Sequence, residues 1–553
     1  MKVTALHAPE DFVASARQAA QRLDTERIYD RILARDHTVW RPEPNEIANR
    51  LGWLDSPQIM RAQLDSIRAV VDAARQEGYT HALLLGMGGS SLAPEVLRAV
   101  FGVADGFLDL AVLDSTHPDA VLATARALDP ARTLFIPATK SGGTVETLSL
   151  LKYFYNFCTD AIGRDAAGAH FAAITDPGSG LEALAARLGF RHIFRNDPNI
   201  GGRYSALSFY GLVAAGAVGI DLNRLLDRAQ AALDDPQPGL QLGAFLGAGS
   251  ERGRDKLTLI ASPGLQAAGA WIEQLIAEST GKGGTGLLPV DLEPAATAYG
   301  DDRLFVYLRL DDALDDRVAS LAAAGHPVLQ LDHSDAYDLG GTFLHWEIAT
   351  AIAGFFLAIH PFDQPNVEAA KVLARDMVAT YQQQGSLPAA EPALVEGDLA
   401  LYGDPGADTL QEALAAFLAA GRKGQSYIAL QAYVHATPDV AQHLAALRGA
   451  LLARTGLATT LGIGPRFLHS TGQLHKGDGG HGLFLQLTAG ARADAPIPDE
   501  AGDPSSGLGF GVLIQAQASG DRQALSDAGR KVLRIHLGSD TGRGLEQLLQ
   551  ALN

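Results

Sequence analysis

Short apolar runs of strand length alternate with helical stretches along most of this chain, and this alternation restricts its fold more than any other feature. In the first unit, an apolar run at 82–85 leads through a glycine-rich turn into a helical pattern at 92–101. Similar strand-like runs follow at 110–113, 133–137 and 171–175. A strand, a covering helix and a further parallel strand repeat in this order in α/β proteins. The sequence therefore predicts parallel sheets covered by helices.

The chain is long enough for about three domains, because a domain typically has about 100–200 residues and this chain has 553. A second series of strand-like runs begins at 257–261, and a further module follows a stretch rich in Pro, Gly, Ala and Glu. In that module we expect strands at 427–434, 482–488 and 510–515. The predicted parts are an N-terminal helical lead-in (1–50), a first three-layer αβα domain with a parallel sheet (51–245), a second one (246–380), a linker or mobile loop (381–410) and a C-terminal α/β module (411–553).

Charge, cysteine content and apolar run length exclude several classes of protein. The formal net charge of −19, from 63 acidic and 44 basic residues, repels the phosphate backbone of nucleic acids. The single cysteine, Cys158, excludes an intrachain disulfide and favours a reducing compartment. The longest strongly apolar stretch, 348–359, is shorter than the roughly 20 residues of a membrane span, and MKVTALHAPEDFV lacks the apolar run of a signal peptide. We therefore expect a cytoplasmic protein without nucleic-acid or membrane partners.

Two polar turns, GMGGSS at 86–91 and TKSGGTVET at 139–147, each follow a predicted strand and precede a predicted helix. Backbone N–H groups and helix N-termini in such turns suit an anion, and the carboxyl ends of parallel strands share one edge of the sheet. Both turns could therefore hold one phosphate. In the alternative interpretation, Thr144 only caps a helix and Lys140 is a solvated charge. The candidate phosphate ligands are Gly89, Ser90, Thr139, Lys140, Ser141 and Thr144.

Five motifs in a fixed order resemble those of the phosphoglucose isomerases. They are GMGGSSL, TKSGGTVET, IGGRYSALS at 200–208, AESTGK at 277–282 and PFDQPNVEAAK at 361–371. The resemblance spans roughly 51–375 and implies two sugar-isomerase (SIS) domains. Asn366 departs from the family pattern, in which glycine is common at this place. The C-terminal module, with ATTLGIGPRFLHSTGQLHKG at 458–477, resembles the end of the isomerase half of bifunctional transaldolase/phosphoglucose isomerases.

The resemblance implies reversible isomerisation of glucose 6-phosphate and fructose 6-phosphate through an enediol(ate), a step of glycolysis and gluconeogenesis. Such chemistry needs a base that moves a proton between C1 and C2 and a cation for the developing enediolate. By resemblance, Glu278 is the base and Arg203 stabilises the enediolate. Gln364 contacts the phosphate and Lys371 the ring oxygen. Seven residues separate Gln364 from Lys371, so a helix through both would place them on one face.

One residue of the family pattern is missing. The family's ring-opening histidine comes from the segment after the base, and residues 290–303 contain no histidine. His469, His475 or His360 could replace it, as could Lys476. We expect no metal, because the spaced histidines of the C-terminal module have no carboxylate pattern or close histidine pair beside them. The resemblance also implies a homodimer that binds a small sugar phosphate and uses no cofactor.

Other functions remain open on the same scaffold. A related isomerase could accept both glucose and mannose phosphates. The isomerase domain of an amidotransferase is disfavoured, because that enzyme needs an N-terminal cysteine and this sequence begins Met1-Lys2-Val3. A non-catalytic sugar-phosphate sensor would keep the two turns but lack the base and the cation.

Overall fold

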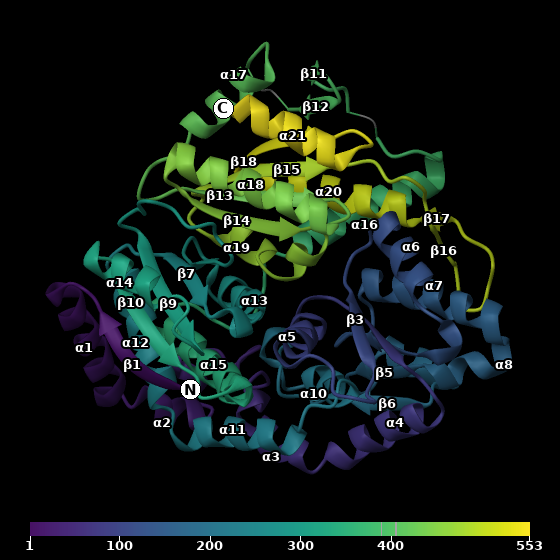
Figure 1. Cartoon of the computed structure of the whole chain (residues 1–553), viewed down its shortest axis with the longest axis horizontal. Coiled ribbons are helices and arrows are strands. Elements are labelled where there is room, and N and C mark those ends of the chain that lie inside the picture. Colours follow the sequence, from purple (N-terminus) through teal and green to yellow (C-terminus); the bar gives the residue numbers. More distant parts are fainter. Residues whose placement is uncertain (389, 404–405, 553) are drawn as a thin grey trace.

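The first sheet has five parallel strands in the order β3-β2-β4-β5-β6, in a computed structural model that describes residues 1–388, 390–403 and 406–552 (Figure 1). The parallel pairing confirms the prediction from the strand–helix alternation. The strands are β2 (His81–Gly86), β3 (Asp109–Leu113), β4 (Thr133–Ala138), β5 (Ala172–Thr175) and β6 (His192–Arg195).

Side chains of β2 alternate between the two faces of this sheet, because successive residues of a strand point to opposite sides. Ala82 and Leu84 pack with α4, α5 and α10, whereas Leu83 and Leu85 pack with α6, α7 and α9. Both faces are therefore covered, which gives the expected three layers. The helices are α3 (Ser56–Arg61), α4 (Leu64–Gln76), α5 (Leu92–Phe101), α6 (Pro118–Ala127), α7 (Val145–Ile162), α8 (Arg164–Ala167), α9 (Gly180–Arg187) and α10 (Phe209–Ala217).

The second sheet has the order β1-β10-β9-β7-β8, in which only the edge strand β1 is antiparallel. Its strands are β1 (Lys2–His7), β7 (Lys256–Ala261), β8 (Leu288–Val290), β9 (Arg303–Arg309) and β10 (Val328–Asp332). Its helices are α1 (Glu10–Thr25), α2 (Ile28–Leu33), α11 (Leu222–Asp234), α12 (Gln237–Glu251), α13 (Ala268–Thr280), α14 (Asp315–Ala323) and α15 (Leu339–Phe356).

The N-terminal lead-in predicted for 1–50 is helical only from Glu10 onward. Residues 2–7 instead form β1, with Lys2 opposite Asp332 of β10. Helix α1 then packs its Phe12 ring against Phe245 of α12, with ring centroids 5.5 Å apart. The N-terminal segment thus belongs to the second sheet. The sequence did not predict β1, because its six side chains are half-buried or exposed and form no continuous apolar run.

The third sheet has six strands in the order β11-β12-β18-β15-β13-β14. Strands β14, β13, β15 and β18 are parallel to one another. Strand β12 pairs antiparallel with β18, and β11 pairs antiparallel with β12. The strands are β11 (Leu394–Glu396), β12 (Leu399–Tyr402), β13 (Tyr427–Tyr433), β14 (Ala458–Ile463), β15 (Gly482–Thr488) and β18 (Lys531–His536), with a separate pair β16 (Pro496–Ile497) and β17 (Leu508–Gly509). The helices are α16 (Glu368–Gln384), α17 (Leu410–Ala419), α18 (Pro438–Thr455), α19 (Gly472–Gly477), α20 (Phe510–Asp527) and α21 (Thr541–Leu552).

Two predictions for this region are wrong. The strand expected at 510–515 is the start of helix α20, because buried residues continue at helical spacing as far as Leu525. The linker expected at 381–410 includes the hairpin β11/β12, which extends the third sheet. Residues 389, 404 and 405 of that linker, and Asn553 of the C-terminal module, lie outside the described residues. The domain boundaries themselves stay predictions.

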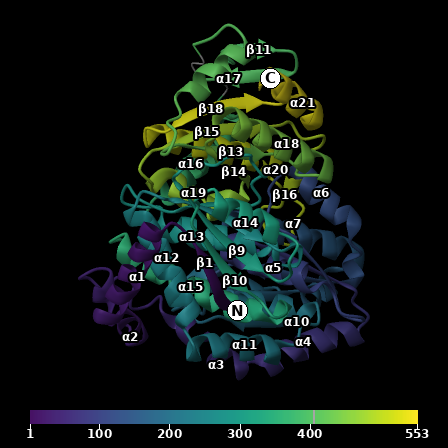
Figure 2. The same cartoon turned by 60° about the vertical axis from the view of Figure 1, so that its left-hand side comes forward.

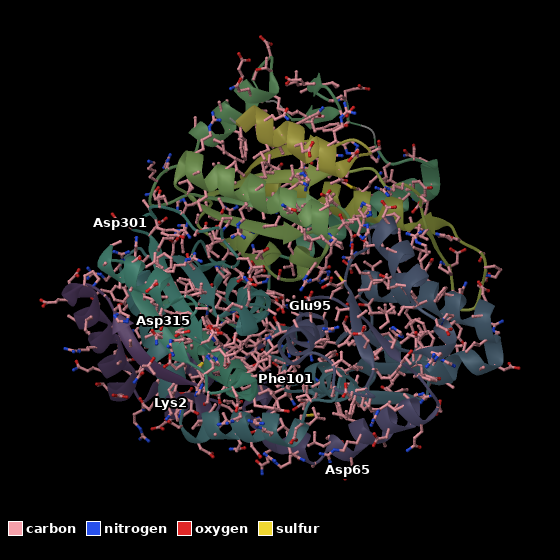
Figure 3. The ribbon with its side chains drawn as sticks, in the orientation of Figure 1. Lys2, Asp65, Glu95, Phe101, Asp301 and Asp315 are labelled. Carbon is pink, nitrogen blue, oxygen red and sulfur yellow. The ribbon has the colours of Figure 1, made fainter. Side chains whose placement is uncertain are left out.

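The C-terminal module lies against both of the other sheets and their helices (Figures 1 and 2). Arg466 forms ion pairs with Glu95 of α5 and with Asp114, which follows β3. Figure 3 labels Glu95 near the middle of the molecule, where the three parts meet. Within the described ranges, no helix combines the length and the apolarity needed to cross a bilayer.

Candidate active site

A cavity of about 380 Å³ opens at the carboxyl ends of the first sheet, between the two turns, the end of α13 and the C-terminal module. All ten residues proposed from the sequence for catalysis or phosphate binding line it. They are Gly89, Ser90, Thr139, Lys140, Ser141, Thr144, Arg203, Glu278, Gln364 and Lys371.

The two turns lie side by side because their strands, β2 and β4, are neighbours, with Gly86 opposite Ala138. The hydroxyl oxygens of Thr139 and Thr144 are 2.7 Å apart. Thr144 is the N-cap residue of α7, yet its side chain forms no capping hydrogen bond. Thr144 lines the cavity and its hydroxyl pairs with Thr139 instead, so the interpretation of Thr144 as only a helix cap is wrong.

Lys140 is half-buried, and the carboxylate of Asp176 holds its ammonium group. Its Nζ donates to Asp176 Oδ2 and, at 2.8 Å, to the carbonyl oxygen of Pro198. Burial raises the pKa of Asp176, and the ion pair with Lys140 acts against this shift. The interpretation of Lys140 as a solvated charge is therefore also wrong. Asp176 lines the cavity too, although no motif in the sequence marks it as a site residue.

Arg203 is the buried cation of the cavity, with 2% of its side chain exposed. Its Nε donates to Ser279 Oγ at 2.7 Å, and its Nη1 donates to Gln364 Oε1 at 2.9 Å. Its Nη2 donates to backbone carbonyls within 361–363. The planar guanidinium is therefore fixed on three sides, and Nη1 lies 3.4 Å from Glu278 Oε1.

Glu278 lies in the last turn of α13, as the sequence predicts, with 13% of its side chain exposed. Its second oxygen accepts a hydrogen bond from Gln274 Nε2 at 3.1 Å. Gln274 also lines the cavity and was missed from the sequence. The sequence does contain a sign of its role, because residues four positions apart, such as Gln274 and Glu278, lie on the same face of a helix.

Gln364 and Lys371 both reach the cavity, but not from one helical face. Helix α16 begins at Glu368, so Gln364 lies in the loop before it. Pro365 keeps Gln364 out of a helix, because the residue before a proline disfavours the helical backbone conformation. The prediction of a shared helix face is therefore wrong. The Lys371 side chain is 46% exposed, and its Nζ lies 4.0 Å from Glu368 Oε2.

Among the histidines considered for ring opening, His469 alone lines this cavity. Its Nε2 lies 2.9 Å from Oε1 of the buried Glu146. His360 is held by backbone groups, with Nε2 3.1 Å from the carbonyl oxygen of Asn45. His475 is buried in the C-terminal module, and burial lowers its pKa well below the ordinary value. His360 and His475 therefore lie outside this cavity, in places where their contacts serve the structure.

Lys476, the remaining candidate, forms an ion pair with Asp521 inside the C-terminal module. It lines a second cavity of about 540 Å³, which shares Thr144, Lys371 and His469 with the first. Helix α16 supplies much of the lining of this second cavity, with apolar side chains such as Val378 beside charged ones such as Arg375, and α20 adds Leu513 and Gln517.

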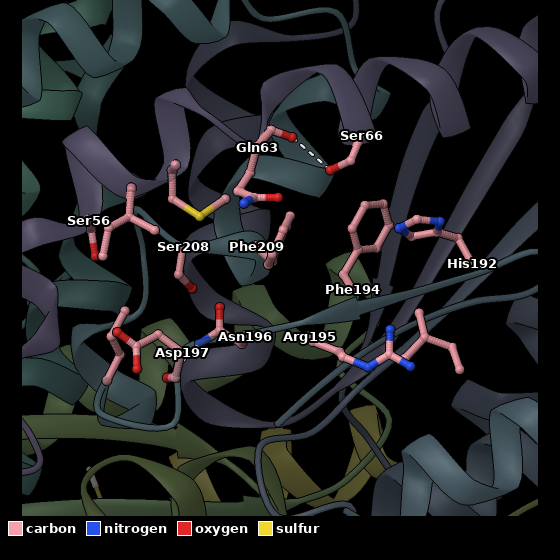
Figure 4. Close-up of a pocket in the computed structure, with 14 residues that line it drawn as sticks. Ser56, Gln63, Ser66, His192, Phe194, Arg195, Asn196, Asp197, Ser208 and Phe209 are labelled. Atoms are coloured by element: carbon pink, nitrogen blue, oxygen red, sulfur yellow. Dashed lines mark hydrogen bonds between the residues drawn. The ribbon is translucent and has the colours of Figure 1, made fainter. Parts of the chain in front are cut away.

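A third cavity, of about 450 Å³, lies between α3, α4 and the end of β6 (Figure 4). Its polar residues include Gln63, His192 and Arg195, and it contains none of the ten proposed site residues. Across the described residues, no group of three or more His, Cys, Asp and Glu side chains is placed to hold a metal ion.

Comparison with known proteins links the first cavity to one family of enzymes. The sequence model described as phosphoglucose isomerase matches residues 56–236, which include both turns and Arg203. A glucose-6-phosphate isomerase from Thermus thermophilus is 30% identical over 387 residues, covering 60% of this chain and 92% of its own. Another, from Rubrobacter xylanophilus, is 26% identical over 383 residues, covering 59% and 87%.

Solved structures agree with the sequence relatives. A crystal structure of a hypothetical protein from Thermus thermophilus matches with a TM-score of 0.55 at 27% identity, covering 68% of this chain and 100% of the other. Glucose-6-phosphate isomerase from Chlamydia trachomatis shares the fold, with a TM-score of 0.57 at 18% identity, covering 66% and 86%. Because a relative with 30% identity is matched over nearly its whole length, and the family match includes both turns of the cavity, this chain belongs to the phosphoglucose isomerase family.

Proposed function

We propose that this protein interconverts glucose 6-phosphate and fructose 6-phosphate by moving a proton between C1 and C2. One observation carries the proposal. The carboxylate of Glu278 and the guanidinium of Arg203 lie 3.4 Å apart in the same cavity as the two hydroxyl-bearing turns. The names of the sequence relatives support the same reaction.

The two turns would hold the phosphate group. Thr139, Thr144, Ser90 and Ser141 supply hydroxyl donors, and the N-termini of α5 and α7 add backbone donors and positive partial charge. The net charge of the chain is −19, so the attraction for a dianion must be local. Lys140 contributes less than a free cation would, because Asp176 already pairs with it.

Glu278 would take the proton from C2 of the open-chain aldose and return it to C1. Removing the C2 proton makes an enediolate, whose negative oxygen the fixed guanidinium of Arg203 stabilises. Gln364 directs its amide oxygen to Arg203, so its amide N–H groups are the part available to a substrate oxygen. Lys371 brings a positive charge to the same cavity and would contact the ring oxygen.

The remaining expectations also belong to this proposal. The substrate is a small sugar phosphate, the reaction uses no metal or cofactor, and the protein works in the cytoplasm as a homodimer. Sedimentation velocity tests the oligomeric state. A protein that stays monomeric at all concentrations would contradict the proposed homodimer.

The function is tested by isomerisation of glucose, mannose and glucosamine 6-phosphates side by side, with chelator-treated enzyme. We expect conversion of glucose 6-phosphate to fructose 6-phosphate without added metal, and exchange of the C2 proton with deuterated solvent. Preference for the mannose or glucosamine substrate would favour the related isomerases. Absence of both conversion and exchange would refute catalysis and leave a sugar-phosphate sensor.

A further inference from the structure

The proposed isomerisation still lacks a residue for ring opening, and the inference below rests on that proposed function. Hexose 6-phosphates exist mainly as rings, and the C2 proton becomes acidic only when C1 is a carbonyl. A group must therefore move a proton between the anomeric hydroxyl and the ring oxygen. The segment 290–303, where the family histidine would lie, contains none.

His469 reaches the cavity from the C-terminal module. It ends the 3₁₀ helix Arg466–His469, and 16% of its side chain is exposed. Its carbonyl oxygen accepts a hydrogen bond of 2.8 Å from Gln274 Nε2, the nitrogen that also donates to Glu278 at 3.1 Å. One glutamine side chain therefore fixes His469 relative to the proposed base.

The turn after β2 also holds the backbone of His469. Gly88 has a φ of +54°, and a Cβ at this position would lie only 2.6 Å from the carbonyl oxygen of His469. The turn can approach the C-terminal module this closely only because residue 88 has no side chain. The turn after β2, helix α13 with the proposed base Glu278, and His469 are thus in direct contact.

The imidazole of His469 is oriented by Glu146, near the start of α7. Glu146 Oε1 lies 2.9 Å from His469 Nε2 and accepts a 2.7 Å hydrogen bond from Gln517 Nε2 of α20. Thr116 Oγ1 donates to Gln517 Oε1 at 2.7 Å, which fixes the orientation of that amide.

Glu146 is ionised in these surroundings. Burial acts to raise its pKa, but the interaction with His469 outweighs burial and lowers it. An ionised carboxylate only accepts hydrogen bonds, so Nε2 of His469 carries a hydrogen. Nδ1 is then the nitrogen that can exchange a proton with a substrate.

We propose that His469 is the acid–base residue that opens the sugar ring, and that Glu146 and Gln517 are its positioning residues. Nδ1 of neutral His469 takes the proton of the anomeric hydroxyl. The O1–H electron pair becomes the C1=O double bond, and the C1–O5 pair goes to O5. The imidazolium then gives its proton to O5, where the ammonium of Lys371 stabilises the developing charge. A proton has moved from O1 to O5, and His469 is unchanged.

The C-terminal module is thereby part of the catalytic site. It contributes His469 and Gln517, and its helix α20 packs closely against α16, which carries Lys371. A Cβ on Gly520 of α20 would lie 2.9 Å from the backbone nitrogen of Ala374. One chain therefore supplies the phosphate turns, the base, the cation and the ring-opening histidine.

The test separates ring opening from proton transfer at carbon. Exchange NMR on glucose 6-phosphate labelled at C1 measures interconversion of its α and β anomers, which requires ring opening only. Glu278→Gln should keep this interconversion and lose isomerisation. His469→Gln retains a donor for Glu146 but cannot relay a proton, so both rates should fall by about 100-fold or more. His443→Gln, on α18 away from the cavity, is the matched control and should keep both.

Glu146→Gln tests the positioning role. It should lower kcat and the anomer interconversion rate while KM stays near the parental value, because the phosphate turns are intact. Parental rates of anomer interconversion in folded His469→Gln would overturn the assignment of His469 and leave the isomerase proposal standing. If the parent itself neither isomerises nor exchanges the C2 proton, the proposed function fails.

Discussion

Asn366 stands in the motif PFDQPNVEAAK where glycine is common in the family, and its contacts explain the difference. Its Oδ1 accepts from Gln473 Nε2 at 2.7 Å, and its backbone N–H donates to Gln473 Oε1 at 2.9 Å. The same Gln473 amide donates to the carbonyl oxygen of Gly281, the residue after the end of α13. Glycine at 366 would lose the side-chain half of this pair, so Asn366 suits a chain in which the C-terminal module covers the motif.

Replacement of Glu278 by glutamine should remove the proposed base without altering the shape of the cavity. The amide keeps the size of the side chain but cannot accept a proton from carbon, so kcat should fall by about 10²–10⁴-fold. Exchange of the C2 proton with deuterated solvent, followed by NMR, measures the effect. Arg203→Lys keeps the charge but not the planar fork, and should be impaired less. Near-parental exchange in Glu278→Gln would show that another group is the base.

The double replacement Ser90→Ala and Thr144→Ala should mainly weaken substrate binding. These hydroxyls are proposed to hold a phosphate that does not react, so KM should rise more than kcat falls, although remote binding energy can also support the chemical step. Calorimetry with inorganic phosphate gives a direct comparison. Unchanged phosphate affinity would contradict the assignment of the two turns.

The site residues that the sequence predicts all lie in contiguous motifs next to strand or helix ends, where pattern and spacing carry the information. Glu146 also lies in such a motif, but its partners His469 and Gln517 are more than 300 positions away. Nothing local in the sequence pairs them. Asp176 was missed for the same reason, because its contact with Lys140 depends on how β4 and β5 pair.

At the scale of elements, the glycine-rich turn after β2 is shaped by a neighbouring backbone. A Cβ on Gly89 would lie 1.9 Å from the carbonyl oxygen of Gly202, next to Arg203. This contact is shorter than any van der Waals separation, and a backbone cannot rotate away as a long side chain can. The turn and the segment that carries Arg203 therefore depend on glycine for their close approach.

Gly89→Ala should lower both stability and activity, because the two backbones must separate. Overpacking typically costs about 1–3 kcal/mol, so the free energy of unfolding should fall by that order. Gly201→Ala is the matched control, because its nearest new neighbours would lie at 3.7 and 3.9 Å. Denaturant unfolding of both variants provides the comparison. Equal stability of the two would mean that the turn has room to move.

Helix α20 shows where element prediction fails. The apolar start of α20 is short, and its helical period becomes visible only when Gln517 and Asp521 are included as buried polar residues. Their burial is a property of the tertiary structure, because Gln517 binds Glu146 and Asp521 binds Lys476. The buried parallel strands β2, β4 and β7 were predicted because they are almost wholly apolar.

At the scale of the whole molecule, two acidic side chains, Glu273 and Asp291, are half-buried where α13 meets the C-terminal module. Burial raises the pKa of Glu273 to about 8 and that of Asp291 to about 7, with Arg448 acting in the opposite direction on both. A carboxyl group in the unfolded chain has a pKa of about 4. Between these values the folded protein binds more protons than the unfolded chain, so stability falls as pH rises.

The free energy of unfolding should therefore decrease between about pH 7 and pH 8.5, a range in which unfolded histidines are largely neutral. One pKa unit corresponds to about 1.4 kcal/mol, so a decrease of about 1 kcal/mol is measurable by urea unfolding. Glu273→Gln cannot ionise and should show a smaller decrease. A parent whose stability rises over this range, or a variant with the same slope, would contradict the protonated state of Glu273.

The pairing of β1 with β10 also concerns the order in which the chain is made. Residues 2–7 are synthesised long before β10, but Lys2 has Asp332 as its partner, and β9 and β7 lie beyond β10 in the same sheet. During synthesis the edge strand must wait until most of the first two sheets has emerged. The second sheet is therefore completed only after β10 has emerged, and until then β1 lacks the strand with which it pairs.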